Sequence, residues 1–144
     1  MKDFSAAVVL MACALGVALA DSDAIAQRKE LMKGDGAATK KLVDMVKGAP
    51  FDLPTVQTSL KTFIAAAAEE PKLFPDDSKS GGGTNALPAI WENKADFNAR
   101  FEKFGKDAEA ALTTITDEAS FKANIRSVLQ NCGGCHELYK AKSS

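Results

Sequence analysis

Apolar residues recur at three- and four-residue steps along most of the chain, which is the period of an amphipathic α-helix. The strongest stretch predicts a helix from Thr84 or Asn85, with inward positions Ile90, Trp91, Phe97, Phe101, Phe104, Ala108, Leu112 and Ile115. A break at Thr116-Asp117 leads into another helix, whose inner side holds Phe121, Ile125, Val128, Leu129, Cys132, His136 and Tyr139. These two patterns define the second half of the molecule.

Two further helices are predicted before them. Asp21, Ser22 and Asp23 can cap the first, and it should end by Gly48. Its expected inward positions are Ile25, Met32, Thr39 and Val46, with Arg28, Leu31, Leu42 and Met45 beside them. Gly34 and Gly36 lie inside this helix, where each costs about 1 kcal/mol relative to alanine. Either the helix bends there or a bulky group lies close to its backbone, and we expect the second.

The next helix should start at Asp52-Leu53-Pro54 and stop at Pro71, with Val56, Leu60, Phe63, Ile64 and Ala67 on one face. Residues 71–83 are rich in proline, glycine, serine and aspartate, so we expect a polar crossover outside the core. Four amphipathic helices with one long connection predict an all-α, antiparallel four-helix bundle. In such bundles cofactor sites lie between facing helices.

Composition supports one helical domain. Alanine is abundant, while the β-branched and aromatic residues that favour strands are comparatively few. The net charge is −1 and acidic and basic residues are interspersed, so nothing indicates a nucleic-acid partner.

Residues 1–20 resemble a secretory signal peptide. Lys2 is followed by a short apolar run, and Ala18-Leu19-Ala20 provides a cleavage site before Asp21. Removal would leave residues 21–144 as a periplasmic domain without stable membrane insertion. Lipoprotein processing at Cys13 is the alternative that we consider.

The run Cys132-Gly133-Gly134-Cys135-His136 is the attachment signature of c-type haem, in which two thiols form thioethers and the histidine binds iron. At about 100° per residue, Cys132, Cys135 and His136 share one helix face. A redox dithiol and a zinc site are the alternatives. A dithiol motif usually opens a helix after a strand, and zinc needs more cysteine or histidine ligands than the exported chain offers.

No methionine or histidine follows the motif, so a sixth iron ligand would come from upstream. Met32 lies on the inward stripe of the first predicted helix. It could bind iron, line the pocket without a bond, or be ordinary core, which is the commoner role of a helical methionine. We assign Met45 to the core.

The chain resembles the class II c-type cytochromes, the cytochrome c′ family. The matching features are Asn131 to Glu137 near the carboxyl end, the run Arg28-Lys29-Glu30-Leu31-Met32-Lys33, and Pro88-Ala89-Ile90-Trp91. The resemblance spans residues 21–142. It implies one covalent haem c per chain, a role in electron transport rather than enzymatic catalysis, redox proteins as partners, and a homodimer as one allowed assembly.

The resemblance also implies that the chain has one of two functions. Low-spin members place a first-helix methionine on iron and carry electrons, whereas high-spin members stay five-coordinate and bind nitric oxide or carbon monoxide. Some high-spin members also have methionine at this position. The segment Pro71 to Pro75 and the crossover look more like the low-spin group, so we expect Met32 and His136 as axial ligands. Arg28 resembles the arginine that contacts a haem propionate; a solvated surface arginine is the alternative.

Overall fold

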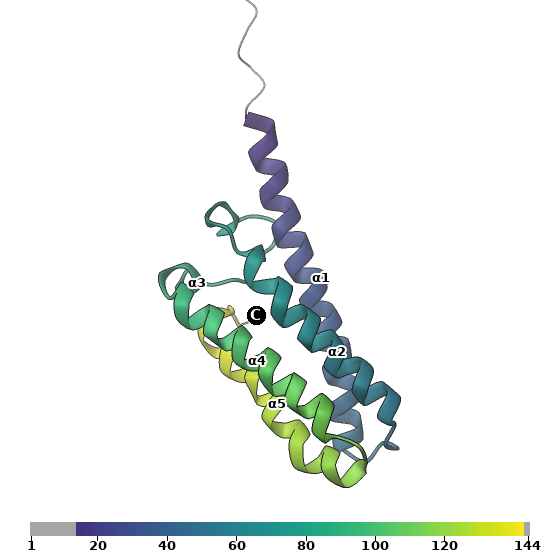
Figure 1. The fold of residues 1–144 in the computed structure, drawn as a ribbon. Helices are drawn as coiled ribbons and strands as arrows, with labels where there is room; N and C mark the ends of the chain where they lie inside the picture. Colours follow the sequence, from purple (N-terminus) through teal and green to yellow (C-terminus); the bar gives the residue numbers. More distant parts are fainter. Residues whose placement is uncertain (1–13, 143–144) are drawn as a thin grey trace, which may run out of the picture.

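Four long helices form an up-and-down bundle in the structure, a computed structural model that describes residues 14–142 and the side chains of residues 23–142 (Figure 1). The helices are α1 (Ala14–Val46), α2 (Leu53–Glu69), α3 (Ala89–Glu92), α4 (Lys94–Thr114) and α5 (Glu118–Tyr139), with the 3-10 turns η1 (Glu70–Leu73) and η2 (Asp76–Ser78) in the crossover. Among the described residues there is no strand, and a single bridge joins Ala86 to Lys140. The predicted all-α four-helix bundle is confirmed.

The start of α1 differs from the prediction. Ala14, the first described residue, is already helical, so Asp21, Ser22 and Asp23 lie within the helix and not at its start. The reason is the alanine- and leucine-rich composition of residues 14–20, which favours helix in the uncut chain. Residues 1–13, including Lys2 and Cys13, lie outside the described part, and cleavage after Ala20 remains a prediction.

The inner face of α1 follows a slightly different stripe from the predicted one. Ile25, Leu42 and Met45 are buried as expected, but Val46 is 49% exposed. The prediction used seven-residue steps, and a straight helix drifts by about 20° per seven residues, so the last step leaves the core. The helix ends as predicted, because Gly48 takes the left-handed φ of 111° that stops it.

The beginning of α2 is as predicted. The Asp52 carboxylate accepts a hydrogen bond of 2.9 Å from the Thr55 N–H, and Pro54 occupies the first turn. Val56, Leu60, Phe63 and Ala67 are buried, and Ile64 packs against the same core. The α-helix ends at Glu69, and Pro71 lies two residues further on, within η1.

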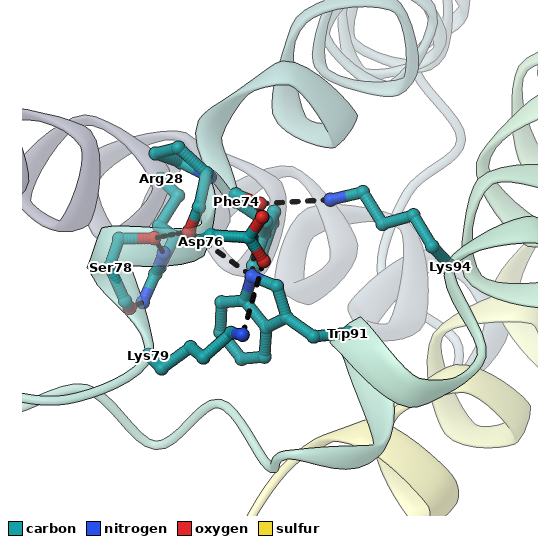
Figure 2. Close-up of polar contacts among 8 residues, drawn as sticks. Arg28, Phe74, Asp76, Ser78, Lys79, Trp91 and Lys94 are labelled. Carbon is teal, nitrogen blue, oxygen red and sulfur yellow. Dashed lines mark hydrogen bonds and ion pairs between the residues drawn. The ribbon is translucent and has the colours of Figure 1, made fainter.

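The crossover is mostly the exposed polar connection that its composition indicated, but two of its side chains are buried. Phe74 and Ser78 are buried, and Arg28 of α1 reaches them (Figure 2). Its guanidinium lies 4.5 Å from the centre of the Phe74 ring. The carbonyl of Phe74 also accepts hydrogen bonds from Trp91 Nε1 at 3.1 Å and Lys94 Nζ at 2.9 Å. Polar groups of helices α1, α3 and α4 therefore anchor a mostly exposed loop around its two buried residues, Phe74 and Ser78.

The third predicted helix is shorter and broken. It begins at Ala89 after Pro88, and Asn93, with φ −124° and ψ 45°, separates α3 from α4. Neither Thr84 nor Asn85 is the N-cap, which is Pro88; the Thr84 hydroxyl accepts hydrogen bonds from Arg28 and from the Ala86 N–H. The predicted inward residues are otherwise confirmed: Ile90, Phe97, Phe101, Phe104, Ala108 and Ile115 are buried, while Trp91 and Leu112 are partly buried.

Two apolar clusters make up the core. The larger one lies between α1, α2, α4 and α5 and includes Leu42, Phe63, Phe104 and Phe121. The smaller one lies at the crossover end and contains Phe74, Ile90, Phe97, Phe101 and Tyr139.

Capping of α5 by Asp117 fixes the start of the last helix as predicted, since the Ser120 N–H donates to the Asp117 carboxylate at 2.8 Å. No helix in the described part is both long and apolar enough to span a membrane.

Truncation of Phe63 tests the larger cluster. Phe63 is fully buried and its ring centre lies 5.3 Å from that of Phe104. We expect Phe63→Ala to lower the free energy of unfolding by about 3–5 kcal/mol, the usual cost of a buried phenylalanine and the cavity it leaves. Denaturant titration of the holoprotein measures this. Phe51→Ala, at a partly buried position, is the matched control; an equal loss from both variants would contradict the assignment.

Candidate haem site

A cavity of about 260 Å³ opens between α1 and α5, two helices that contact each other only sparsely in the described part of the bundle. The side chains around it come from α1, η1, α4 and α5, and the lining residues are Met32, Asp35, Gly36, Thr39, Glu70, Arg100, Phe101, Phe104, Asn131, Cys132, Cys135 and His136. The first and last helices thus face each other across a space, as expected for a cofactor site in a bundle.

Helix α5 presents the haem-attachment motif to this cavity. Cys132, Cys135 and His136 all line it, which follows from their i, i+3 and i+4 positions on one helix face. Burial lowers the pKa of His136, so its imidazole is neutral at neutral pH, the form that binds a metal. The two thiols are free and partly buried. All three predicted residues are therefore brought together.

The thiols are poor candidates for disulfide exchange. Burial raises the pKa of Cys132, and it raises that of Cys135 to about 11. Reactive dithiols have lowered thiol pKa values, because the thiolate is the nucleophile. The electrostatics here are those of an apolar pocket, which disfavours the dithiol alternative.

Helix α1 supplies the opposite wall. Met32 is partly buried, lines the cavity and packs against the smaller core cluster. Gly36 also lines it, and a Cβ at that position would have no atom within 4 Å. The glycine leaves open space beside the helix backbone, where we expected a bulky group. Met45 lies in the larger core cluster, as assigned.

These residues fit a c-type haem. The aromatic rings of Phe101 and Phe104 give the cavity apolar walls, the two thiols are unpaired, and a neutral histidine lies beside them. A C-x-x-C-H motif attaches haem through its two cysteines and binds the iron through its histidine. Here Cys132 and Cys135 would hold the porphyrin and His136 would bind its iron.

Arg28 is placed outside the residues that line the cavity. Its Nη1 donates to Leu73 O at 2.9 Å, and its Nη2 donates to Thr84 Oγ1 at 2.8 Å. Nη1 also donates to Ser78 Oγ at 2.8 Å and Nη2 to Ser78 O at 2.9 Å (Figure 2). Only 4% of the residue is exposed, which excludes the solvated surface alternative. The propionate contact stays a prediction, and the crossover contacts are a role that the sequence did not indicate.

Three charged residues in the cavity were missed by sequence reasoning. Asp35 and Glu70 are buried, and Arg100 lines the cavity with its guanidinium donating to Gly134 O at 3.2 Å and to Asp96 at 2.6 Å. Their helical spacing was the available signal: Asp35 follows Met32 by three residues, and Glu70 continues the stripe of Phe63 and Ala67.

Comparison with known proteins agrees with this arrangement. The cytochrome c′ family model matches residues 23–140. A cytochrome c′ of Rhodopseudomonas palustris is 52% identical over 130 residues, covering 90% of this chain and 89% of the relative. A cytochrome c-556 of Agrobacterium fabrum is 34% identical over 138 residues, covering 94% of this chain and 93% of the relative.

Solved structures give the same result. The structure of cytochrome c′ from Rhodopseudomonas palustris superposes with a TM-score of 0.83 at 52% identity, covering 85% of this chain and 98% of that one. An NMR-validated structural model of oxidised cytochrome c556 from the same organism gives a TM-score of 0.78 at 31% identity, covering 85% and 98%. This chain therefore belongs to the cytochrome c′ family, whose members bind one covalent c-type haem per chain.

Proposed function

We propose that this protein is a periplasmic electron carrier in which His136 and Met32 are the two axial ligands of a haem held by Cys132 and Cys135. The observation that supports this is the position of Met32 and His136 on facing helices around one cavity. A thioether opposite an imidazole favours the ferrous form and raises the potential. The site would then carry electrons without catalysing a reaction of its own.

Two protein ligands also suit electron transfer for a structural reason. They hold the metal in nearly the same geometry in both oxidation states, so little rearrangement accompanies each electron. The protein supplies burial and orientation, while the haem supplies the redox chemistry. Residues 1–20, as a signal peptide, would direct the chain to the periplasm, where the haem is attached.

Redox proteins are the proposed partners. Lys29, Lys33, Lys140 and Lys142 are exposed and could steer an acidic partner, which would raise the association rate more than the affinity. Part of this charge is already paired, because Lys33 lies 3.4 Å from Glu30. We therefore propose a weak encounter surface, and a homodimer remains an allowed assembly.

The second candidate function is gas binding by a five-coordinate iron. The similarity that favours it is the 52% identity to a protein named cytochrome c′, against 34% to the cytochrome c-556 of Agrobacterium fabrum. In that case Met32 would line the pocket without bonding to iron.

An optical spectrum of the purified, reduced protein with and without carbon monoxide separates the two. An electron carrier with both ligands gives a low-spin spectrum that carbon monoxide barely changes. Rapid uptake of carbon monoxide by a high-spin ferrous iron would overturn the proposal in favour of gas binding. A protein without haem absorbance, with Cys132 and Cys135 titratable by thiol reagents, would overturn both.

A further inference from the structure

The cavity contains two buried carboxyl groups for which the proposed function gives no role. Glu70, at the junction of α2 and η1, is 0% exposed, and neither of its carboxylate oxygens has a hydrogen-bond partner among the described residues. Asp35 of α1 is 8% exposed, and its Oδ1 also has no partner there. Buried carboxylates are costly unless they are paired, so such groups tend to hold a proton.

Other titratable or charged groups facing this space can be assigned. The cavity receives Arg100 from α4, and Cys132, Cys135 and His136 from α5. Arginine keeps its charge at all accessible pH values. In the haem-loaded protein both thiols are used in thioether bonds and the imidazole is bound to iron. Asp35 and Glu70 are the protein groups of the cavity lining left to exchange protons.

Burial and mutual repulsion both favour the protonated forms. Burial raises the pKa of Asp35 to about 7. Burial, and then repulsion from the Asp35 carboxylate, raise the pKa of Glu70 to about 8. As pH rises Asp35 ionises first, and Glu70 then holds its proton beside a negative charge. Glu70 is therefore the group that exchanges a proton at neutral to mildly alkaline pH.

We propose that Glu70 is a redox-linked proton site, which is protonated when the haem is reduced and releases its proton when the haem is oxidised. On oxidation, one electron leaves for the redox partner, the O–H bond of the Glu70 carboxyl breaks, and the proton passes to solvent. The net charge of the cavity is then unchanged. The iron of a bound haem would lie in the same cavity as this buried carboxylate. A negative charge on Glu70 would then stabilise the oxidised iron, and a protonated Glu70 would accompany the reduced iron.

This inference rests on the proposed electron-carrier function, and it is tested by the reduction potential of the holoprotein as a function of pH. The carboxylate stabilises the oxidised state, so the potential falls as pH rises through the titration of Glu70. The steepest slope expected is about 59 mV per pH unit, the one-electron equivalent of a tenfold change in proton activity.

Three variants make the test specific. Glu70→Gln keeps the shape of the side chain and is expected to lose the part of the fall that the titration of Glu70 causes. Asp35→Asn removes the neighbouring charge and is expected to move the fall to lower pH. Glu69→Gln is the matched control, because Glu69 lies on the surface and pairs with Lys72 at 2.8 Å; its profile should follow the wild type.

A second measurement does not depend on the potential. The infrared difference spectrum between the reduced and oxidised protein near pH 8 should show a protonated carboxyl band that disappears on oxidation and is absent from Glu70→Gln. A Glu70→Gln profile that overlays the wild type, or an equal change in Glu69→Gln, would overturn the inference. Coordination is read separately from the carbon monoxide spectra, so failure of the proposed function is distinguishable from failure of this inference.

Discussion

Replacing Met32 by alanine is expected to open the sixth coordination position of the haem. The variant should change from a low-spin to a high-spin ferrous spectrum and take up carbon monoxide readily. Its potential should fall by on the order of 0.1 V, within the roughly 0.8 V range over which axial ligands set haem potentials. The reason is that the thioether of Met32 favours the ferrous state. Optical spectra and a redox titration measure both changes.

Met45→Ala is the matched control for this substitution. Met45 lies on the same helix but belongs to the larger core cluster, away from the residues that line the cavity. It should lower the stability of the protein and leave the haem spectrum unchanged. If Met32→Ala leaves the spectrum and the potential as they are in the wild type, Met32 is not an axial ligand.

Replacing Arg28 by methionine is expected to lower the free energy of unfolding by at least about 3 kcal/mol. The substitution removes four hydrogen bonds from a side chain that is 4% exposed. It leaves Ser78 and the carbonyl of Leu73 without their charged donor at buried and partly buried points of the crossover, and each hydrogen bond to a charged group contributes about 1.5–3 kcal/mol. Denaturant titration of the holoprotein measures the loss.

Lys33→Met is the control for Arg28, since Lys33 is an exposed residue of the same helix and pairs only with Glu30 among the described residues. It should change stability little. The potential of Arg28→Met adds a second readout. An unchanged potential would assign Arg28 to the crossover alone, whereas a clear shift would support the predicted contact with a haem propionate. Equal stability of the two variants would contradict the crossover role.

Local signals made most of the bundle predictable. Gly48, Asp52 and Asp117 define helix ends. Gly48 does so through its backbone conformation, and the two aspartates do so through capping hydrogen bonds to residues that follow closely in the chain. The structure has those ends where the sequence predicted them. The haem motif is equally local, because one helix turn brings its cysteines and histidine to the same face.

The crossover could not be predicted in the same way. Its composition is that of an exposed loop, yet Phe74 and Ser78 are buried because a side chain 50 residues earlier, Arg28, donates to Ser78. The break at Asn93 likewise accompanies hydrogen bonds from Trp91 and Lys94 to the crossover. These features depend on contacts between distant segments, which hydrophobic periodicity does not encode.

The candidate site was partly predictable for the same reason. Cys132, Cys135 and His136 follow from a motif, and Met32 from its place on an inward stripe. Asp35 and Glu70 come together only when α1 packs against η1, so neither carboxyl could be recognised as one of a pair from sequence.

The most direct test of the account is the mass of the purified protein under denaturing conditions, which release any haem that is not covalently bound. We expect the mass of residues 21–144 plus one haem, with the haem retained through Cys132 and Cys135. A mass equal to that of the polypeptide alone would contradict the covalent site on α5 and, with it, the proposed ligands and the redox role of the cavity.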